Sequence, residues 1–117
     1  AERLPALFVR TPGGQALPTP EDSPLLLLGD SHTLVFHAGG DLHARGAGLP
    51  DLLARKLRRP VDLIGVRGSG ATPSRMNLYW KAASSSAYLA GKRIVVWCLS
   101  AREFTESDWR PIPLPGP

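Results

Sequence analysis

The residues of this 117-residue chain best suited to chemistry are Asp30, Ser31 and His32, which directly follow four consecutive leucines. A serine hydroxyl is a candidate nucleophile for acyl transfer, and a neighbouring carboxylate and imidazole can line its site. The run Leu25-Leu26-Leu27-Leu28, ended by Gly29, is typical of a strand buried on both faces of a parallel sheet. Open α/β sheets bind ligands at the carboxyl ends of their strands, where Ser31 stands. The alternative interpretation is that Asp30 and Ser31 only cap the next segment.

The elements that must position Ser31 alternate between strands and helices. Apolar runs predict strands over 25–28, 61–66 and 94–99, and helices are predicted over 49–57 and 72–89. Right-handed crossovers make these strands parallel, which predicts an α/β three-layer sandwich with a central parallel sheet. Its three polar strand ends then share one edge, at Gly29-Asp30-Ser31, Gly65 to Gly68 and Ser100-Ala101-Arg102.

Finer features follow from local patterns. The uninterrupted apolar run 94–99 predicts a central strand, and Cys98 within it is expected to be a packing residue rather than a nucleophile. Residues 7–9 predict a short edge strand. The first helix is expected to bury an apolar stripe, and the second to start at an N-cap Thr72. The packing residues expected on these two helices are Leu49, Leu52, Leu53 and Leu57, and then Met76, Tyr79, Trp80, Ala83 and Ala87.

Composition predicts one domain, with an extended arm over 1–23, an α/β domain over 24–110 and a proline-rich tail over 111–117. The net charge is +4, and the densest basic cluster is Arg55-Lys56 with Arg58-Arg59 at a predicted helix end. We interpret it as a solvated helix end rather than a nucleic-acid site, with anionic polymers or membrane surfaces as the alternative. We expect no membrane-spanning segment in this chain, no cofactor and no metal.

An acyl-transfer site also needs donors aimed at the developing oxyanion. The backbone N–H groups of Ser31 and Gly68 are the candidates, and the guanidinium of Arg102 is a third donor from the last strand end. Arg67 is expected to line the same edge.

These residues resemble a known family in order and spacing. Gly29-Asp30-Ser31 resembles block I of the SGNH (GDSL) hydrolases, and Gly65-Val66-Arg67-Gly68 resembles block II, with Gly68 as the oxyanion donor. Block III carries Gly-x-Asn in those enzymes, whereas this chain has Arg102 in place of the asparagine. Three further segments resemble the SGNH-like domain of the alginate O-acetyltransferase family: Trp97 followed by Arg102-Glu103-Phe104, Gly46-Ala47-Gly48-Leu49, and Trp109 to Leu114.

The resemblance implies O-acetylation, or deacetylation, of an exopolysaccharide in the periplasm or cell envelope. Ser31 would take the acetyl group from a donor and pass it to a sugar hydroxyl, alongside other members of a polysaccharide-modification complex. The resemblance also implies an Asp-x-His pair, which the ordinary enzymes carry downstream of block III and the alginate-type relatives carry upstream of the serine. Neither place holds one in this chain, although Asp41-Leu42-His43 occurs in a glycine-rich loop and makes His43 a candidate base.

We therefore expect this chain to be the C-terminal portion of a longer enzyme whose Asp/His pair lies in the preceding part. The isolated chain is then expected to be inactive. His32 is interpreted as a site-lining residue and His37 as a surface residue. Two alternatives stay open: a catalytically inert SGNH-like module that binds polysaccharide or a partner, and an anionic-ligand site at Arg67 and Arg102.

Overall fold

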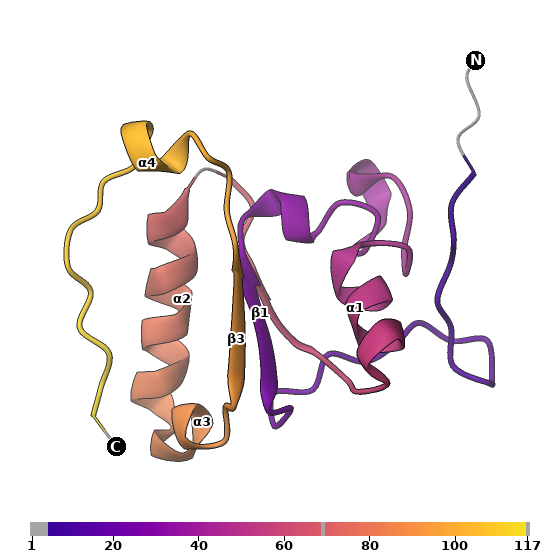
Figure 1. The fold of residues 1–117 in the computed structure, drawn as a ribbon, viewed down its shortest axis with the longest axis horizontal. Coiled ribbons are helices and arrows are strands. Elements are labelled where there is room, and N and C mark those ends of the chain that lie inside the picture. The colour runs from indigo at the N-terminus through magenta and orange to yellow at the C-terminus, as the bar shows by residue number, and fades with distance from the viewer. Residues whose placement is uncertain (1–4, 69, 117) are drawn as a thin grey trace.

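The computed structural model describes residues 5–68 and 70–116. Helices lie on both sides of a three-stranded parallel sheet of order β2-β1-β3, which confirms the predicted α/β class (Figure 1). The elements, in chain order, are β1 (Leu25–Gly29), η1 (Ser31–Thr33), η2 (Gly40–Leu42), α1 (Leu49–Leu57), β2 (Asp62–Gly65), α2 (Ala71–Ser84), α3 (Ser86–Ala90), β3 (Ile94–Cys98) and α4 (Glu103–Glu106).

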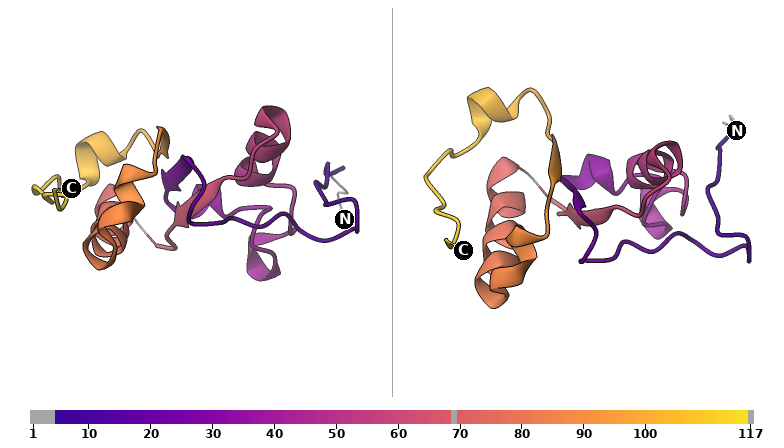
Figure 2. Two further views of the ribbon diagram at one scale, coloured as in Figure 1. Left: turned by 90° about the horizontal axis from the view of Figure 1, so that it is seen from below. Right: turned by 60° about the horizontal axis from the view of Figure 1, so that its bottom comes forward.

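The core forms on the two faces of β1, whose five residues are all buried. Because side chains alternate along a strand, Leu26 and Leu28 pack on one side with α2 and α3, through Leu78 and Tyr88. On the other face Leu25 and Leu27 pack with α1, through Ala54. Two views of the ribbon show the sheet between these helices (Figure 2). The prediction that the leucine run is a doubly covered strand is thus confirmed.

The prediction that residues 94–99 form a central strand is wrong, because β3 is at the edge of the sheet. Its side chains from Ile94 to Trp97 are 37% to 57% exposed. The apolar pattern correctly indicates a strand. It does not reveal whether a second strand pairs with β3 or whether helices cover both of its faces. Cys98, at the end of β3, is half-buried and packs against the core on the α1 side, as expected of a packing residue.

The predicted bounds of α1 are confirmed, but its buried face is not the leucine stripe. Pro50, Asp51 and Ala54 are buried, whereas three of the four leucines are exposed. The exposed leucines are Leu49, Leu52 and Leu57. The face of α1 that is buried therefore carries Pro50, Asp51 and Ala54, and most of its leucines are exposed.

The second predicted helix is divided and starts earlier than expected. Gly70, not Thr72, is the N-cap of α2, and the extended backbone of Ser85 separates α2 from α3. The buried face follows small side chains at 71, 74 and 82 together with Leu78, not the predicted aromatic face. Trp80, for example, is 58% exposed. Small residues let α2 approach the sheet closely, which the hydrophobic pattern does not reveal.

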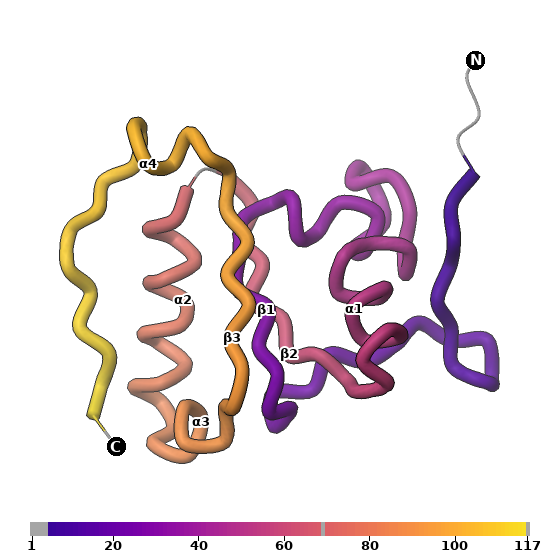
Figure 3. Tube along the Cα trace, in the orientation of Figure 1, coloured from indigo at the N-terminus to yellow at the C-terminus, as the bar shows by residue number. Residues whose placement is uncertain are grey.

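The two ends of the chain lie on opposite sides of the molecule. No strand forms at residues 7–9, contrary to prediction; the arm makes one isolated antiparallel bridge, Arg10 to Ala16, and runs beside α1. The tail from Ser107 to Gly116 is irregular, as predicted, and runs back along α2 (Figure 3). In the part of the chain that the structure describes, we find no helix with the length and apolarity needed to cross a bilayer.

Candidate functional site

The three polar strand ends meet at one edge of the sheet. Gly29 is in register with Gly65 on one side and with Cys98 on the other. The N–H of Val66 donates to the carbonyl oxygen of Gly29 at 3.1 Å, which fixes the start of the next turn against the end of β1. The segments after β1, β2 and β3 therefore begin side by side.

Ser31 is the first residue of η1, directly above the end of β1, and is partly exposed. Asp30 is the N-cap of η1, and its carboxylate accepts the N–H of His32 at 2.9 Å. Burial alone would raise the pKa of Asp30, but hydrogen bonds from His32 and from the N–H of Ser100 hold it below its usual value. The capping interpretation is thus confirmed for Asp30.

Two backbone donors near Ser31 are free to bind an oxyanion. Among the described residues, neither the N–H of Ser31 nor that of Gly68 has an acceptor. Gly68 has a φ of +90°, and the space that a Cβ there would enter holds no atom within 4 Å. Positive φ favours glycine, so the residue type follows from the shape of this turn. The two donors lie after adjacent strands, at the shared edge.

Arg102 and Arg67 are both engaged by carboxylates. The Arg102 side chain is 63% exposed, with its Nε 3.9 Å from Glu106, and the described residues show no hydrogen bond from it to Ser31. The guanidinium of Arg67 forms a two-pronged ion pair with Asp41, which holds the pKa of that carboxyl below its usual value. An anionic ligand at this edge would therefore have to compete with Asp41 for the guanidinium of Arg67.

His43 is the candidate base from the sequence, and His32 is the residue next to Ser31. His43 has a φ of +76° and packs against Phe36, with ring centres 5.4 Å apart. Its expected partner Asp41 instead pairs with Arg67. The Nδ1–H of His32 donates to the carboxylate of Asp30 at 2.9 Å, and the His32 side chain is 69% exposed. Neither imidazole is hydrogen-bonded to the Ser31 hydroxyl in the part of the chain that the structure describes.

His37 is not the surface residue that the sequence predicted. Its side chain is only 18% exposed, and its Nδ1 lies 2.9 Å from Oδ2 of the buried Asp51. The same carboxylate oxygen accepts the N–H of Gly48 at 3.0 Å, at the start of α1. His37 is buried because the loop folds back onto that start: a Cβ at Gly48 would come within 3 Å of the His37 backbone. The pair fixes the loop after η1 to α1.

Glu103 is a residue of this site that the sequence analysis missed. It is 5% exposed, and its Oε2 accepts the N–H of Ala71 at 2.8 Å. The bond joins the segment after β3 to the first residue of α2, which follows the turn of Gly68. The carbonyl oxygen of Glu103 also accepts the indole N–H of Trp109 at 2.8 Å. The sequence gives no signal for this burial, because Glu103 stands between Arg102 and Phe104 in a polar segment.

Replacing Glu103 by alanine is expected to lower the free energy of unfolding by about 1.5–3 kcal/mol, because the buried N–H of Ala71 loses its charged acceptor. Glu103→Gln keeps an oxygen acceptor for Ala71 and should lose less than about 1 kcal/mol. Urea denaturation of both variants measures the difference, and equal losses in the two would show that this hydrogen bond does not hold α2 to the segment after β3.

No metal centre is apparent in residues 5–68 and 70–116, where no group of three or more histidine, cysteine, aspartate or glutamate side chains is suitably placed. Comparison of the chain with protein-family models, with curated proteins and with solved structures gives no match.

Proposed function

We propose that Ser31 is the nucleophile of an acyl transfer, most specifically the O-acetylation of an exopolysaccharide. The observation that carries the proposal is that the N–H groups of Ser31 and Gly68, which follow the adjacent strands β1 and β2, have no acceptor among the described residues. Such donors stabilise the oxyanion of a tetrahedral intermediate. Arg102 supplies the third donor if its exposed side chain leaves Glu106 and turns toward Ser31.

The reaction proceeds in two halves that balance in protons. The Ser31 oxygen attacks the acetyl carbonyl, its proton passes to a base and then to the leaving group of the donor, and an acetyl-serine remains. A sugar hydroxyl then loses its proton to the same base, attacks the acetyl carbon and releases Ser31 with its proton restored. Water in place of the sugar gives deacetylation.

The base is an Asp–His pair from outside these 117 residues. The supporting observation is that no histidine of the described residues is hydrogen-bonded to the Ser31 hydroxyl, although His32 and His37 each pair with an aspartate. A serine without a base is a weak nucleophile, so the isolated chain turns over slowly or not at all.

The fold that fits this chemistry is a partial SGNH-like sandwich, related in architecture to flavodoxin-like folds. The parallel sheet, the helices on both faces and the serine after the first strand all support it. The resemblance of the blocks supports the remaining assignments: a polysaccharide acceptor, an acetyl donor, association with other polysaccharide-modifying proteins, and a place in the periplasm or cell envelope.

The test is active-site labelling of the full-length protein with a serine-reactive phosphonate, followed by mass spectrometry of the peptides. The phosphonate should be found on the peptide that contains Ser31 and should be blocked by prior incubation with an acetyl donor. Labelling spread over several serines at equal rates would refute a special nucleophile at residue 31.

A second candidate is a catalytically inert module of the same fold that binds polysaccharide. The observation that favours it is the Arg102–Glu106 contact, which engages the proposed third donor with a carboxylate. Isothermal titration with acidic and neutral oligosaccharides separates the two candidates. Binding with no acetyl turnover in the full-length protein would establish the module and exclude the enzyme.

A further inference from the structure

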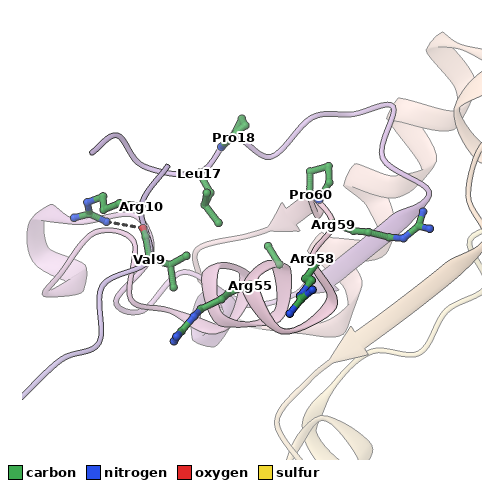
Figure 4. Close-up of a pocket in the computed structure, with 9 residues that line it drawn as sticks. Val9, Arg10, Leu17, Pro18, Arg55, Arg58, Arg59 and Pro60 are labelled. Atoms are coloured by element: carbon green, nitrogen blue, oxygen red, sulfur yellow. Dashed lines mark hydrogen bonds between the residues drawn. The ribbon is translucent and has the colours of Figure 1, made fainter. Parts of the chain in front are cut away.

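A hollow of about 340 Å³ lies between the N-terminal arm and the end of α1, away from the strand ends that carry Ser31 (Figure 4). Its floor is apolar and includes Val9 and Ala54, each 7% exposed, together with Leu17. Four arginines surround this floor, and we call them the basic rim: Arg10 from the arm, and Arg55, Arg58 and Arg59 from α1 and the residues after it.

The basic rim has no compensating carboxylate among the described residues. No aspartate or glutamate lines the hollow, and none of the four guanidiniums takes part in an ion pair there. A helix C-terminus favours a cation in its last turn, which accounts for Arg55. It does not account for Arg10, which reaches the same hollow from a segment more than forty residues earlier and is held by the carbonyl oxygen of Arg45 at 2.9 Å.

Exposed apolar side chains accompany the basic rim. The guanidinium of Arg10 lies over the ring of Phe8, 5.1 Å from its centre, and Phe8 is 50% exposed. Leu52 is 39% exposed and stands one turn before Arg55 and Lys56 on α1. A solvated basic helix end would carry polar residues at these positions, so the combination of cations and exposed apolar groups needs another explanation.

We propose that this surface binds an anionic phospholipid bilayer. Lipid phosphates would bind the guanidiniums of Arg55, Arg58 and Arg59, which are suited to two-pronged contacts with phosphate oxygens. Arg10 adds positive charge, while its terminal nitrogens donate to the carbonyl oxygens of Val9 and Arg45. Phe8 and Leu52 would enter the headgroup region, as the apolar side of an interfacial helix does. An acidic polymer would use the same arginines, but it would have no use for the two apolar side chains.

The experiment is co-sedimentation of the chain with vesicles of phosphatidylcholine, with and without phosphatidylglycerol. We expect binding that requires phosphatidylglycerol and weakens as salt is raised. Arg59→Glu should lower the partition coefficient by about tenfold or more, since it removes one attractive charge and adds a repulsive one. Arg93→Glu is the matched control: it makes the same charge change at an exposed residue before β3 and should lower partition by much less.

The apolar half of the proposal has its own pair of variants. Leu52→Ser should lower partition severalfold, whereas Phe104→Ser, at a 72% exposed residue on α4, should not. These four side chains are exposed, so circular dichroism should show that each variant folds. Suppose that Arg59→Glu weakens binding to polyglutamate and that Leu52→Ser changes neither polyglutamate binding nor vesicle binding. This result would show that the surface binds an acidic polymer rather than a membrane. Absence of phosphatidylglycerol-dependent binding would also overturn the proposal, and neither result bears on Ser31.

Discussion

Replacing Ser31 by alanine is expected to lower acetyl-ester turnover by the full-length protein on the order of 10⁴-fold or more, since removal of a catalytic nucleophile in serine enzymes costs this much. The substitution removes only an oxygen from a partly exposed residue, and Asp30 still caps η1 through the backbone N–H of His32. The melting temperature should therefore change little. Turnover of an activated acetyl ester, measured together with thermal unfolding, separates loss of chemistry from loss of fold.

Ser86→Ala is the matched control for this result. Ser86 is an exposed serine at the start of α3, outside the proposed site, and its substitution should leave turnover unchanged. Unchanged turnover in Ser31→Ala would show that Ser31 is not the nucleophile. Equal losses in both variants would point to a general effect of the substitution on the protein.

The largest expected effect on stability comes from Lys92, whose charge is buried at the amino end of the sheet. Its Nζ lies 2.9 Å from Asp62, and the two side chains are 4% and 1% exposed. The same Nζ donates to the carbonyl oxygens of Glu21 and Ser23, at 2.5 and 2.8 Å. Replacing Lys92 by methionine leaves the Asp62 carboxylate buried without its cation, so the free energy of unfolding should fall by about 3–5 kcal/mol. Urea denaturation measures this fall.

Lys81→Met is the control for the buried pair. Lys81 pairs with Glu21, whose side chain is 69% exposed, so its loss should cost less than about 1 kcal/mol. The double variant Asp62→Asn with Lys92→Met removes both charges and should recover part of the stability lost in Lys92→Met. A Lys92→Met variant no less stable than Lys81→Met would show that the buried pair does not hold the sheet.

Tyr88 belongs to the same cluster, since its hydroxyl donates to Asp62. Burial, and then the hydrogen bond and charge of Asp62, raise the pKa of Tyr88, so the phenol stays protonated and remains a donor. The cluster joins β2, α3 and the segment before β3. The sequence pattern does not predict this cluster, because Asp62 stands 26 positions before Tyr88 and 30 positions before Lys92.

Local patterns predicted the elements that depend on local causes. The run Leu25–Leu28 is long enough and apolar enough to require cover on both faces, and β1 has that cover. Pro50 and Asp51 suit the first turn of a helix, and α1 begins at Leu49. The order of these elements then fixed the parallel sheet and the shared edge of its strand ends, because crossovers are right-handed.

Features that depend on distant partners could not be predicted. The exposure of β3 depends on which strand is its neighbour, and the buried face of α2 depends on how closely it approaches β1. The His37–Asp51 pair depends on a loop folding back over fourteen positions. At the site, the sequence predicted that Ser31 and Gly68 lie at one edge of the sheet, but it did not predict the Arg102–Glu106 contact or the buried Glu103.

A crystal structure of the full-length protein with a phosphonate bound to Ser31 would show whether the N–H groups of Ser31 and Gly68 form an oxyanion hole. We expect the phosphoryl oxygen to lie about 2.7–3.1 Å from the two N–H nitrogens, the range expected for oxyanion donors. A phosphoryl oxygen that points into solvent, with both N–H groups unoccupied, would rule out this oxyanion hole.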